Sequence, residues 1–316
     1  MGFRTYMGKL KVLNRVDFNV QEREKVGIIG ESGCGKTTTM KAILRILATN
    51  AMVEGGDIHF RGHNMLRIDG KKLSEIRRKN LTMIFQDPTA ALNPVFKVES
   101  ILGDVIRFSG SFDHDKATKK LIREKSLDAL KEVSLPDPER VLDSYPFQLS
   151  GGMRQRVCIA MSLATAKDLM IADEPTTNLD VTIQDQVLRL MKDLVEKKNL
   201  SIILISHALG TIRNTVDTVY VMYAGSMIEA ASTRELFSDP LHPYAQGLLK
   251  SVPKLTGAGF SEGIKGRIPD YINPPAGCRF HPRCEYALDI CRKEKPELLK
   301  VDANNHRVAC WLHNKR

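Results

Sequence analysis

The sequence lacks an apolar run long enough to cross a membrane. Its longest apolar stretch, around residues 201–206, has the length of a β-strand, whereas a membrane-spanning helix needs about 20 apolar residues. The N-terminal residues, MGFRTYMGKLKVL, also lack the apolar core of a secretory signal peptide. We therefore expect a cytoplasmic protein.

Extended basic segments are also missing, although the chain carries a formal net charge of +10. No run of five or more Lys and Arg residues occurs, and aromatic residues make up only 6% of the chain. A basic excess can favour binding to nucleic acid or to an anionic membrane surface. Without basic runs, a solvated surface rich in Lys explains the charge better.

Cysteine is scarce over most of the chain, where only Cys34 and Cys158 occur, and the other four are clustered near the C-terminus as Cys278, Cys284, Cys291 and Cys310. In a reducing compartment, clustered thiols indicate metal ligation rather than disulfides. The spacing C-x5-C-x6-C-x18-C lacks the closely spaced pairs of structural zinc sites, and four thiolates can also hold a [4Fe–4S] cluster. Spacing alone leaves zinc, iron–sulfur and unligated cysteines open.

Apolar strand patterns alternate with helical patterns along much of the chain. Residues 12–29 alternate as in a strand and end in the sequence VGII, and buried-strand patterns recur at 169–172 and 202–205. A glycine-rich loop and a helical run over 40–47 follow the first of them. Apolar strands that alternate with helices predict a parallel sheet covered on both faces.

Two regions differ from this pattern. Residues 98–143 are rich in Lys, Asp, Glu and Leu at helical spacing, which predicts a helical subdomain inserted between the strands. From about residue 236, Pro, Gly and Cys become frequent. This change predicts an extended tail that folds into a small C-terminal unit.

A phosphate-binding motif lies between the first predicted strand and the first predicted helix. The segment Gly30-Glu-Ser-Gly-Cys-Gly-Lys36-Thr37 matches G-x-x-x-x-G-K-[ST] at every fixed position. Glycines let backbone N–H groups turn inward around phosphates, and the helix N-terminus adds a favourable dipole. Lys36 is expected to reach the β- and γ-phosphates, and the Thr37 hydroxyl to ligate Mg²⁺.

Two adjacent carboxylates, Asp173 and Glu174, follow the apolar residues 169–172. Both acids should lie at the C-terminal end of a buried strand, where ligands bind in open α/β sheets. Asp173 is expected to hold Mg²⁺ through water, and Glu174 to polarise the attacking water as a general base. Alone, the pair would be better explained as two surface acids after a core strand; the phosphate motif favours the catalytic role.

A second glycine turn, Leu149-Ser-Gly-Gly-Met-Arg-Gln-Arg156, leads into a helical pattern, and Gln86 and His207 each follow an apolar strand. With the phosphate motif and the acidic pair, these residues resemble the ATP-binding-cassette (ABC) family, whose signature is the LSGG element. The resemblance covers most of residues 6–237. It implies an α/β fold with a P-loop ABC ATPase core of parallel sheet, an antiparallel β subdomain and a helical subdomain at about 88–165. The ATPase domain would span 1–237, and a small Cys-rich extension would span 238–316.

The resemblance also assigns roles to individual residues. Glu174, His207 and Gln86 would be catalytic, with His207 on the γ-phosphate and Gln86 sensing the membrane partner. Mg²⁺ would be held by Thr37, Gln86 and Asp173. Tyr6 would stack on adenine, and the remaining ATP contacts would come from Gly30, Ser32, Gly33, Cys34, Gly35, Lys36, Thr37 and Thr38.

A single cassette of this family cannot complete an ATP site alone. Ser150, Gly151 and Gly152 would bind the ATP that a second subunit holds, and the loop Asn178-Leu179-Asp180 would cross to that subunit. The resemblance therefore implies a second ATPase cassette, identical or related, with opening and closing of the pair coupled to transport.

Longer segments resemble the ATPase subunits of dipeptide and oligopeptide importers, a subgroup that also serves nickel and oligosaccharide import. They are Met83-Ile-Phe-Gln-Asp-Pro88, Tyr145-Pro-Phe-Gln-Leu-Ser-Gly-Gly, Ile171-Ala-Asp-Glu-Pro-Thr-Thr177 and Asp239-Pro-Leu-His-Pro-Tyr-Ala-Gln246. The subgroup implies a peripheral protein on the cytoplasmic face of the cell membrane. Its partners would be a related ATPase as heterodimer, two integral membrane permease subunits and, indirectly, an extracytoplasmic solute-binding protein, but no nucleic acid. The tail around Cys278 resembles one whose four cysteines bind a [4Fe–4S] cluster, with zinc as the alternative.

Three features depart from the family pattern. Ala208 follows His207 where Asp is usual, Asn178 stands where a small residue is more frequent, and only five residues precede Tyr6. Two other functions remain as alternatives: a soluble ABC ATPase acting on nucleic acid, and an iron–sulfur redox or sensor protein with a regulatory nucleotide site. The transporter ATPase is the leading hypothesis, because the chain has neither a long coiled-coil insertion nor a second cassette.

Overall fold

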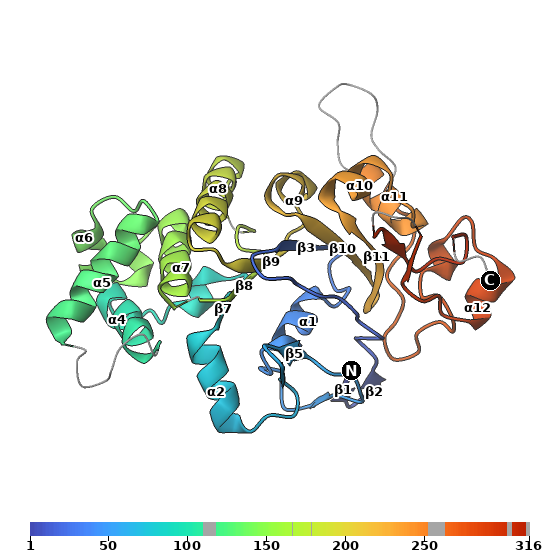
Figure 1. Cartoon of the computed structure of the whole chain (residues 1–316), viewed down its shortest axis with the longest axis horizontal. Helices are drawn as coiled ribbons and strands as arrows, with labels where there is room; N and C mark the ends of the chain where they lie inside the picture. Colours follow the sequence, from blue (N-terminus) through green and yellow to red (C-terminus); the bar gives the residue numbers. More distant parts are fainter. Residues whose placement is uncertain (110–117, 166, 178, 252–262, 302–304, 314–316) are drawn as a thin grey trace. The chain divides into compact units, whose positions relative to one another are not determined.

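The computed structural model describes residues 1–109, 118–165, 167–177, 179–251, 263–301 and 305–313 (Figure 1). Its contacts divide the chain into two units. The first unit comprises Met1–Asn19, Val26–Leu66 and Ile205–Arg316, and the second comprises Val20–Lys25 and Arg67–Leu204. Each unit contains strands that are covered by helices.

A mixed sheet forms the core of the first unit. Its strands follow the order β12–β13–β11–β10–β3, with bounds β3 Lys25–Ile29, β10 Thr218–Tyr223, β11 Ser226–Ser232, β12 Leu299–Lys300 and β13 Arg307–Val308. β3 and β10 run parallel, whereas the pairs β10–β11, β11–β13 and β12–β13 are antiparallel. Val26, Ile28 and Ile29 are buried, which fits the continuous apolar run of a strand covered on both faces.

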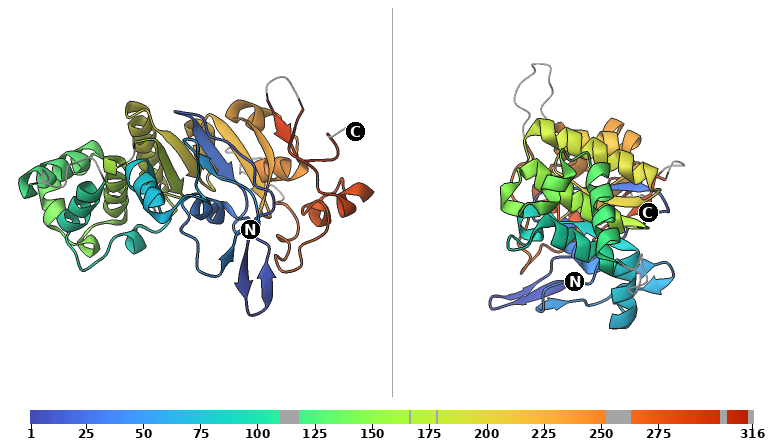
Figure 2. Two further views of the ribbon diagram at one scale, coloured as in Figure 1. Left: turned by 60° about the horizontal axis from the view of Figure 1, so that its bottom comes forward. Right: turned by 90° about the vertical axis from the view of Figure 1, so that its left-hand side faces the viewer.

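Smaller strands and short helices complete the first unit. The strands β1 Gly2–Thr5, β2 Gly8–Leu10 and β4 Ala51–Met52 form one antiparallel sheet, and β5 His59–Phe60 pairs with β6 His63–Asn64. The hairpin of β1 and β2 is drawn in dark blue beside the N-terminus in Figure 2. The helices are α1 Lys36–Ile43, α9 Leu209–Thr215, α10 Thr233–Ser238, α11 Pro243–Lys250 and α12 Asp289–Lys293, with a 3-10 turn, η3, at His281–Arg283.

The second unit combines three strands with most of the longer helices. The strands lie in the order β9–β8–β7, with bounds β7 Leu81–Ile84, β8 Leu169–Asp173 and β9 Ser201–Ile205, and β7 runs parallel to β8. The helices are α2 Gly70–Lys79, α3 Pro88–Ala91, α4 Val98–Phe108, α5 Lys119–Glu132, α6 Pro138–Asp143, α7 Gly151–Thr165 and α8 Val181–Lys197, with a 3-10 turn, η2, at Pro146–Gln148. α5 contacts α4, α6 and α7, which cluster in green in Figure 1.

Local sequence explains why several of these helices begin where they do. Asp69 and Asp180 accept hydrogen bonds from backbone N–H groups at the starts of α2 and α8, as N-cap side chains do. Pro138 follows the N-cap residue Asp137 at the start of α6, a position where the missing proline N–H costs nothing. Apolar residues of α4 at helical spacing, among them Leu102 and Ile106, are buried.

The structure confirms the α/β fold and corrects several details. The sheet is mixed rather than parallel, because β11 and β13 add antiparallel strands. The strand expected over 12–29 is confined to Lys25–Ile29, and the helix expected over 40–47 is α1 at Lys36–Ile43. Arg45 has φ 54, a left-handed conformation that cannot continue an α-helix.

The C-terminal segment, predicted as an extended tail that folds into a small unit, contains regular helices and strands. It supplies α11, α12 and η3, and its strands β12 and β13 join the sheet of the first unit through β11. Helices occupy 98–108, 119–132 and 138–143, as the helical spacing over 98–143 predicted. Among the residues that the structure describes, no helix has the length and apolar character needed to cross a bilayer.

Candidate functional site

The phosphate loop, residues 30–37, connects β3 to α1 in the first unit. Gly30, Gly33 and Gly35 have φ values of 154, 80 and 111, and a side chain rarely adopts these conformations. A Cβ added to Gly30 would lie 2.2 Å from the carbonyl oxygen of Met222. The loop therefore requires glycine both for its conformation and for its close approach to β10.

The ammonium group of Lys36 folds back over the phosphate loop. Lys36 is only 5% exposed, and its Nζ donates hydrogen bonds to the carbonyl oxygens of Gly30 at 2.8 Å and Glu31 at 3.1 Å. A cation is thus held inside a ring of backbone next to a helix N-terminus. This arrangement suits an anion such as a phosphate group, which both the cation and the helix dipole attract.

The other predicted loop residues differ in exposure. Ser32 and Gly33 are exposed, whereas Thr37 and Thr38 lie half-buried in the first turn of α1. Cys34 is fully buried, and burial raises the pKa of its thiol. Burial thus disfavours the Cys34 thiolate, the form that acts as a nucleophile or a metal ligand.

Three side chains from the C-terminal part of the chain hold the phosphate loop, and no sequence motif predicts them. Arg283 forms a bidentate ion pair with Glu31, with Nη1–Oε2 and Nη2–Oε1 distances of 2.8 and 3.0 Å. The Tyr271 hydroxyl donates to the Gly33 carbonyl at 2.7 Å. The Tyr244 hydroxyl accepts from the Glu31 N–H at 2.8 Å. The segments around Tyr244 and Arg283 stood out in the sequence only for their resemblance to the importer subgroup.

Two further predicted residues, His207 and Tyr6, belong to the first unit. His207 is exposed two residues after β9. Ala208 is the N-cap of α9 and supplies no side-chain hydrogen bond, and its own N–H donates to Ser206 Oγ at 3.0 Å. An Asp at this position could cap the helix. Tyr6, in the turn between β1 and β2, is 98% exposed, so its ring face is available for stacking.

The acidic pair lies at the end of β8 in the second unit. All five residues of β8 are buried, and Asp173 and Glu174 are only 2% and 9% exposed. Gln86 Nε2 donates a hydrogen bond to Glu174 Oε2 at 2.9 Å, and Thr177 Oγ1 lies 3.1 Å from the same oxygen. The structure thus brings together Gln86, which follows β7, and Glu174, which follows β8.

The backbone of Glu174 is unusual for a residue with a side chain. Its φ of 48 places it in the left-handed region, which non-glycine residues adopt infrequently. Such conformations persist only where the surrounding structure enforces them, and they cluster at functional sites. The Glu174 carboxylate is therefore aimed by its backbone as well as by Gln86.

The LSGG turn, residues 149–152, forms the start of α7. Ser150 is exposed and its Oγ accepts a hydrogen bond from the Met153 N–H at 3.3 Å. A Cβ added to Gly152 would lie 3.0 Å from Ile183 Cγ2, so α7 can approach α8 closely. The turn places an exposed hydroxyl and two glycines at the N-terminus of a 15-residue helix, a feature that suits an anion.

The crossing loop predicted at Asn178-Leu179-Asp180 is described only in part. Asn178 lies outside the described residues. The Leu179 N–H donates to the Thr176 carbonyl at 3.1 Å, and Asp180 accepts from the Ile183 N–H at 3.0 Å as the N-cap of α8. The described part of the loop is therefore an ordered turn between β8 and α8.

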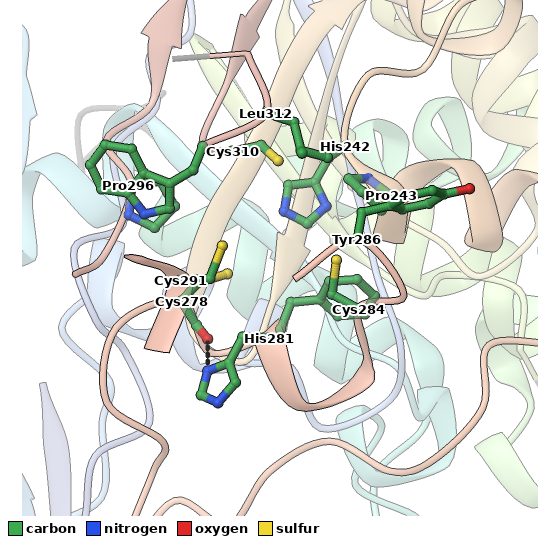
Figure 3. Close-up of a pocket in the computed structure, with 12 residues that line it drawn as sticks. His242, Pro243, Cys278, His281, Cys284, Tyr286, Cys291, Pro296, Cys310 and Leu312 are labelled. Carbon is green, nitrogen blue, oxygen red and sulfur yellow. Dashed lines mark hydrogen bonds between the residues drawn. The ribbon is translucent and has the colours of Figure 1, made fainter. Parts of the chain in front are cut away.

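The four C-terminal cysteines line one pocket in the first unit. Figure 3 shows the sulfur atoms of Cys278, Cys284, Cys291 and Cys310 around a common space next to His242. The pocket walls are largely apolar, with Phe280, Pro296, Trp311 and Leu312 among them. The Cys278 N–H donates to the Cys291 carbonyl at 2.9 Å, which fixes two of the four segments to each other.

Burial in this pocket disfavours the thiolate form at three of the four cysteines. Burial raises the pKa of Cys278 and of Cys310 to about 11, and it also raises the pKa of Cys284. Within the described residues, no three His, Cys, Asp or Glu side chains form a group ready to hold a single metal ion. The assembled metal site expected from the sequence is therefore not found there, since a single ion needs all its sulfur ligands within about 2.3 Å.

Comparison with known proteins gives matches along almost the whole chain. The family profile described as ABC transporter matches residues 13–177, and the profile of the oligopeptide/dipeptide transporter C-terminal region matches residues 228–291. The oligopeptide transport ATP-binding protein OppD of Bacillus subtilis is 42% identical, covering 99% of this chain and 86% of its own length. The dipeptide transport ATP-binding protein DppD of the same organism is 42% identical, covering 100% of this chain and 93% of its own length.

Solved structures share the fold. The dimeric ATP-binding cassette MJ0796, in a post-hydrolysis state with ADP and Pi, superposes with a TM-score of 0.65 at 25% identity. The match covers 74% of this chain and 95% of the cassette.

Proposed function

The chain belongs to the ABC transporter family, and from this premise we propose that it is the ATP-hydrolysing subunit of an importer for dipeptides, oligopeptides or a related solute. The observation that carries the chemistry is the hydrogen bond between Gln86 and Glu174 at the end of the buried strand β8. A buried carboxylate with an imposed direction, in a chain with an intact phosphate loop, suits a general base for phosphoryl transfer to water. Nickel and oligosaccharides remain alternative solutes.

In this proposal the phosphate loop binds the triphosphate. The Lys36 ammonium exchanges its contacts with Gly30 and Glu31 for the β- and γ-phosphates, and the loop N–H groups from Gly30 to Thr38 surround them. Thr37, Asp173 and Gln86 would hold Mg²⁺, which would supply positive charge to offset the phosphate charge. Tyr6 stacks on the adenine ring, for which its exposed side chain is suited.

The catalytic step takes place at the γ-phosphate. Glu174 accepts a proton from the attacking water while the bond from that water to phosphorus forms and the bond to the leaving ADP oxygen breaks. Gln86 orients Glu174, and His207 contacts the γ-phosphate. The first products are ADP and inorganic phosphate.

Variants of Lys36 and Glu174 separate binding from chemistry. Lys36→Ala should weaken binding of a fluorescent ATP analogue, whereas Glu174→Gln should keep that binding and lower phosphate release at least about 100-fold. Glu124→Gln, at an exposed position of α5, is the matched control and should behave as the unmodified chain. Normal turnover by Glu174→Gln would refute the mechanism.

The proposal includes a second cassette. Ser150, Gly151 and Gly152 contact the ATP held by a related ATPase, so that two chains close over two nucleotides. Exposure of Ser150 at the N-terminus of α7 supports this role. The heterodimer is preferred over the homodimer because importers of this subgroup, as the sequence resemblance implies, pair related ATPases.

Membrane subunits are proposed to dock on the second unit. Its segment from β7 to α7 exposes large apolar side chains, among them Val95, Phe96 and Phe147 at 70%, 53% and 67%. Several large apolar side chains exposed in one segment indicate a surface that binds another protein. The chain would then work peripherally on the cytoplasmic face of the membrane, with two permease subunits, a solute-binding protein acting through them, and no nucleic acid.

Isolation from native membranes tests these partners. We expect the chain to co-purify with a related ATPase and two membrane proteins, and to stimulate peptide uptake when the complex is reconstituted in vesicles. Recovery of a homodimer without membrane proteins would contradict the assembly.

We further propose that Cys278, Cys284, Cys291 and Cys310 hold a [4Fe–4S] cluster, with zinc as the alternative. Four thiols around one apolar pocket support the cluster. The sulfur ligands of a four-iron cluster bind different iron atoms, so they lie farther from one another than the ligands of a single ion do. When bound, the group supplies the positive charge that buried thiolates need. The pocket lined by the four cysteines would stabilise the extension at 238–316. The ATPase domain would span 1–237, with its helical subdomain at about 88–165.

Metal analysis decides between the two groups. Anaerobic purification should give a brown protein with iron and acid-labile sulfide, and Cys291→Ser should lose both. A colourless protein with stoichiometric zinc would assign the site to zinc instead.

A further inference from the structure

The ion pair between Arg283 and Glu31 connects the cysteine pocket to the phosphate loop. Glu31 is the second residue of that loop, and Arg283 immediately precedes Cys284. The side chain of Arg283 is only 6% exposed and that of Glu31 is 28% exposed. The pair is therefore largely shielded from water, where a bidentate contact between guanidinium and carboxylate is strong and directional.

Arg283 is itself held in place from several sides. Its Nε donates to the Lys265 carbonyl at 2.8 Å, and its Nη2 donates to the Ile264 carbonyl at 3.1 Å. The guanidinium carbon lies 5.7 Å from the centre of the Tyr223 ring, within cation–π range. These contacts fix the guanidinium that faces the Glu31 carboxylate.

Two tyrosines fasten the same stretch of loop. The Tyr244 hydroxyl accepts a hydrogen bond from the Glu31 N–H, and the Tyr271 hydroxyl donates one to the Gly33 carbonyl. Both hydroxyl groups come from the C-terminal part of the chain that also contains Arg283. The phosphate loop is thus fixed from outside at its second and fourth residues.

The charge of Glu31 makes the contact important for nucleotide binding. A carboxylate in a loop that surrounds phosphates repels them, and this repulsion is strong where water is partly excluded. Arg283 neutralises this carboxylate and holds it in one direction. Without Arg283, Glu31 would be an uncompensated negative charge in the phosphate loop.

On the basis of the proposed ATPase function, we propose that Arg283 is a positioning residue for nucleotide binding, because it neutralises and orients Glu31. Through Arg283, the cysteine pocket controls the affinity of the phosphate loop for ATP. By linkage, a change at the pocket that displaces Arg283 lowers ATP affinity, and bound ATP favours the arrangement in which Arg283 contacts Glu31.

Equilibrium binding of a fluorescent ATP analogue with Mg²⁺ to the purified full chain tests this proposal. Arg283→Gln should raise the dissociation constant at least about fivefold. Arg283→Lys, which keeps the charge but loses the bidentate geometry, should give an intermediate value. Arg292→Gln, at an exposed position of α12, removes the same charge from the same segment and should leave the constant unchanged.

The double variant Glu31→Gln, Arg283→Gln distinguishes neutralisation from general damage. Because it removes the uncompensated carboxylate, it should recover most of the affinity that Arg283→Gln loses. Cys284→Ser should weaken binding in the same direction as Arg283→Gln. Unchanged affinity in Arg283→Gln, no recovery in the double variant, or unchanged affinity in Cys284→Ser would each overturn the proposal.

Failure of this proposal can be distinguished from failure of the proposed function. If Lys36→Ala binds the nucleotide normally, the phosphate loop is not the ATP site and the proposed function fails. If Lys36→Ala loses binding while Arg283→Gln retains it, the proposed function stands and only the role of Arg283 fails.

Discussion

Gly30 and Gly33 occupy the same loop, but a side chain would meet very different surroundings at the two positions. At Gly30 the added Cβ would lie 2.2 Å from a backbone carbonyl of β10, whereas at Gly33 no atom lies within 4 Å. Gly30→Ala should therefore cost about 3 kcal/mol of unfolding free energy or more. Gly33→Ala should cost only about 1 kcal/mol, from its positive φ.

Urea unfolding of both variants measures this difference. Gly70→Ala, at the first residue of α2 with no atom near the added Cβ, is the control and should leave the midpoint unchanged. Equal losses for the two loop variants would show that β10 does not constrain the loop.

At the residue scale, the sequence predicts residues that belong to local motifs but not residues whose partners are distant in the chain. The phosphate loop, Gln86 and the acidic pair were identifiable, because each follows a strand at a fixed spacing. Arg283 was not, because its partner Glu31 lies 252 positions away and no local pattern records such a pair. The same is true of Tyr271, 238 positions from Gly33.

The proposed contact between the start of α7 and a second cassette can be tested at position 150. A bulky side chain at position 150 should obstruct contact with a second cassette but leave the chain's own phosphate loop intact. We expect Ser150→Phe to bind the fluorescent ATP analogue normally and to lower turnover of the assembled transporter at least about tenfold, as loss of an anion-stabilising donor does. Ser238→Phe, at an exposed position of the first unit, is the control; lost analogue binding in Ser150→Phe would contradict the assignment.

The exposed face of α2 gives a pH-dependent prediction. Lys79 and Lys72 donate hydrogen bonds to Glu75 at 2.9 and 3.1 Å, and these contacts lower the pKa of Glu75 to about 2. The pKa of Glu75 in the unfolded chain is about 4.5. Between about pH 4.5 and pH 2, Glu75 therefore takes up a proton in the unfolded chain but not in the folded chain. The stabilising contribution is therefore complete above about pH 4.5 and is lost as the pH falls through about 2.

Carboxyl titration by NMR can check this pKa. Lys79→Gln removes the larger cause and should raise the Glu75 pKa toward 4.5, whereas Lys71→Gln, on the same helix, should change it much less. A Glu75 pKa near 4.5 in the unmodified chain would refute the paired arrangement.

At the element scale, the sequence predicted helices better than sheet topology. Helical spacing over 98–143 corresponds to α4, α5 and α6, because those helices depend on local periodicity. The antiparallel strand β11 was missed, since it contains the fully buried Glu229, a residue typical of surfaces. That carboxylate is satisfied by the N–H groups of Leu241 and His242 and by His306, partners that only the folded chain provides.

For the molecule as a whole, the exposed apolar residues of the second unit predict where the transporter assembles. Val95→Asp and Phe96→Asp should abolish co-purification with the membrane subunits while binding of the ATP analogue is unchanged. Charge on a surface that becomes buried against a partner is costly because it must be desolvated. Val53→Asp, an exposed apolar position in the first unit, is the control; retained assembly in both docking variants would place the membrane contact elsewhere.

The discontinuity of the first unit has a consequence for synthesis of the chain. Its sheet and phosphate loop are built from Met1–Asn19, Val26–Leu66 and Ile205–Arg316, so the N-terminal part of the unit leaves the ribosome well before its C-terminal partners. At about 5–20 residues per second, Glu31 waits on the order of tens of seconds for Arg283. A prematurely terminated chain would thus carry the whole phosphate motif but none of the side chains that fasten it.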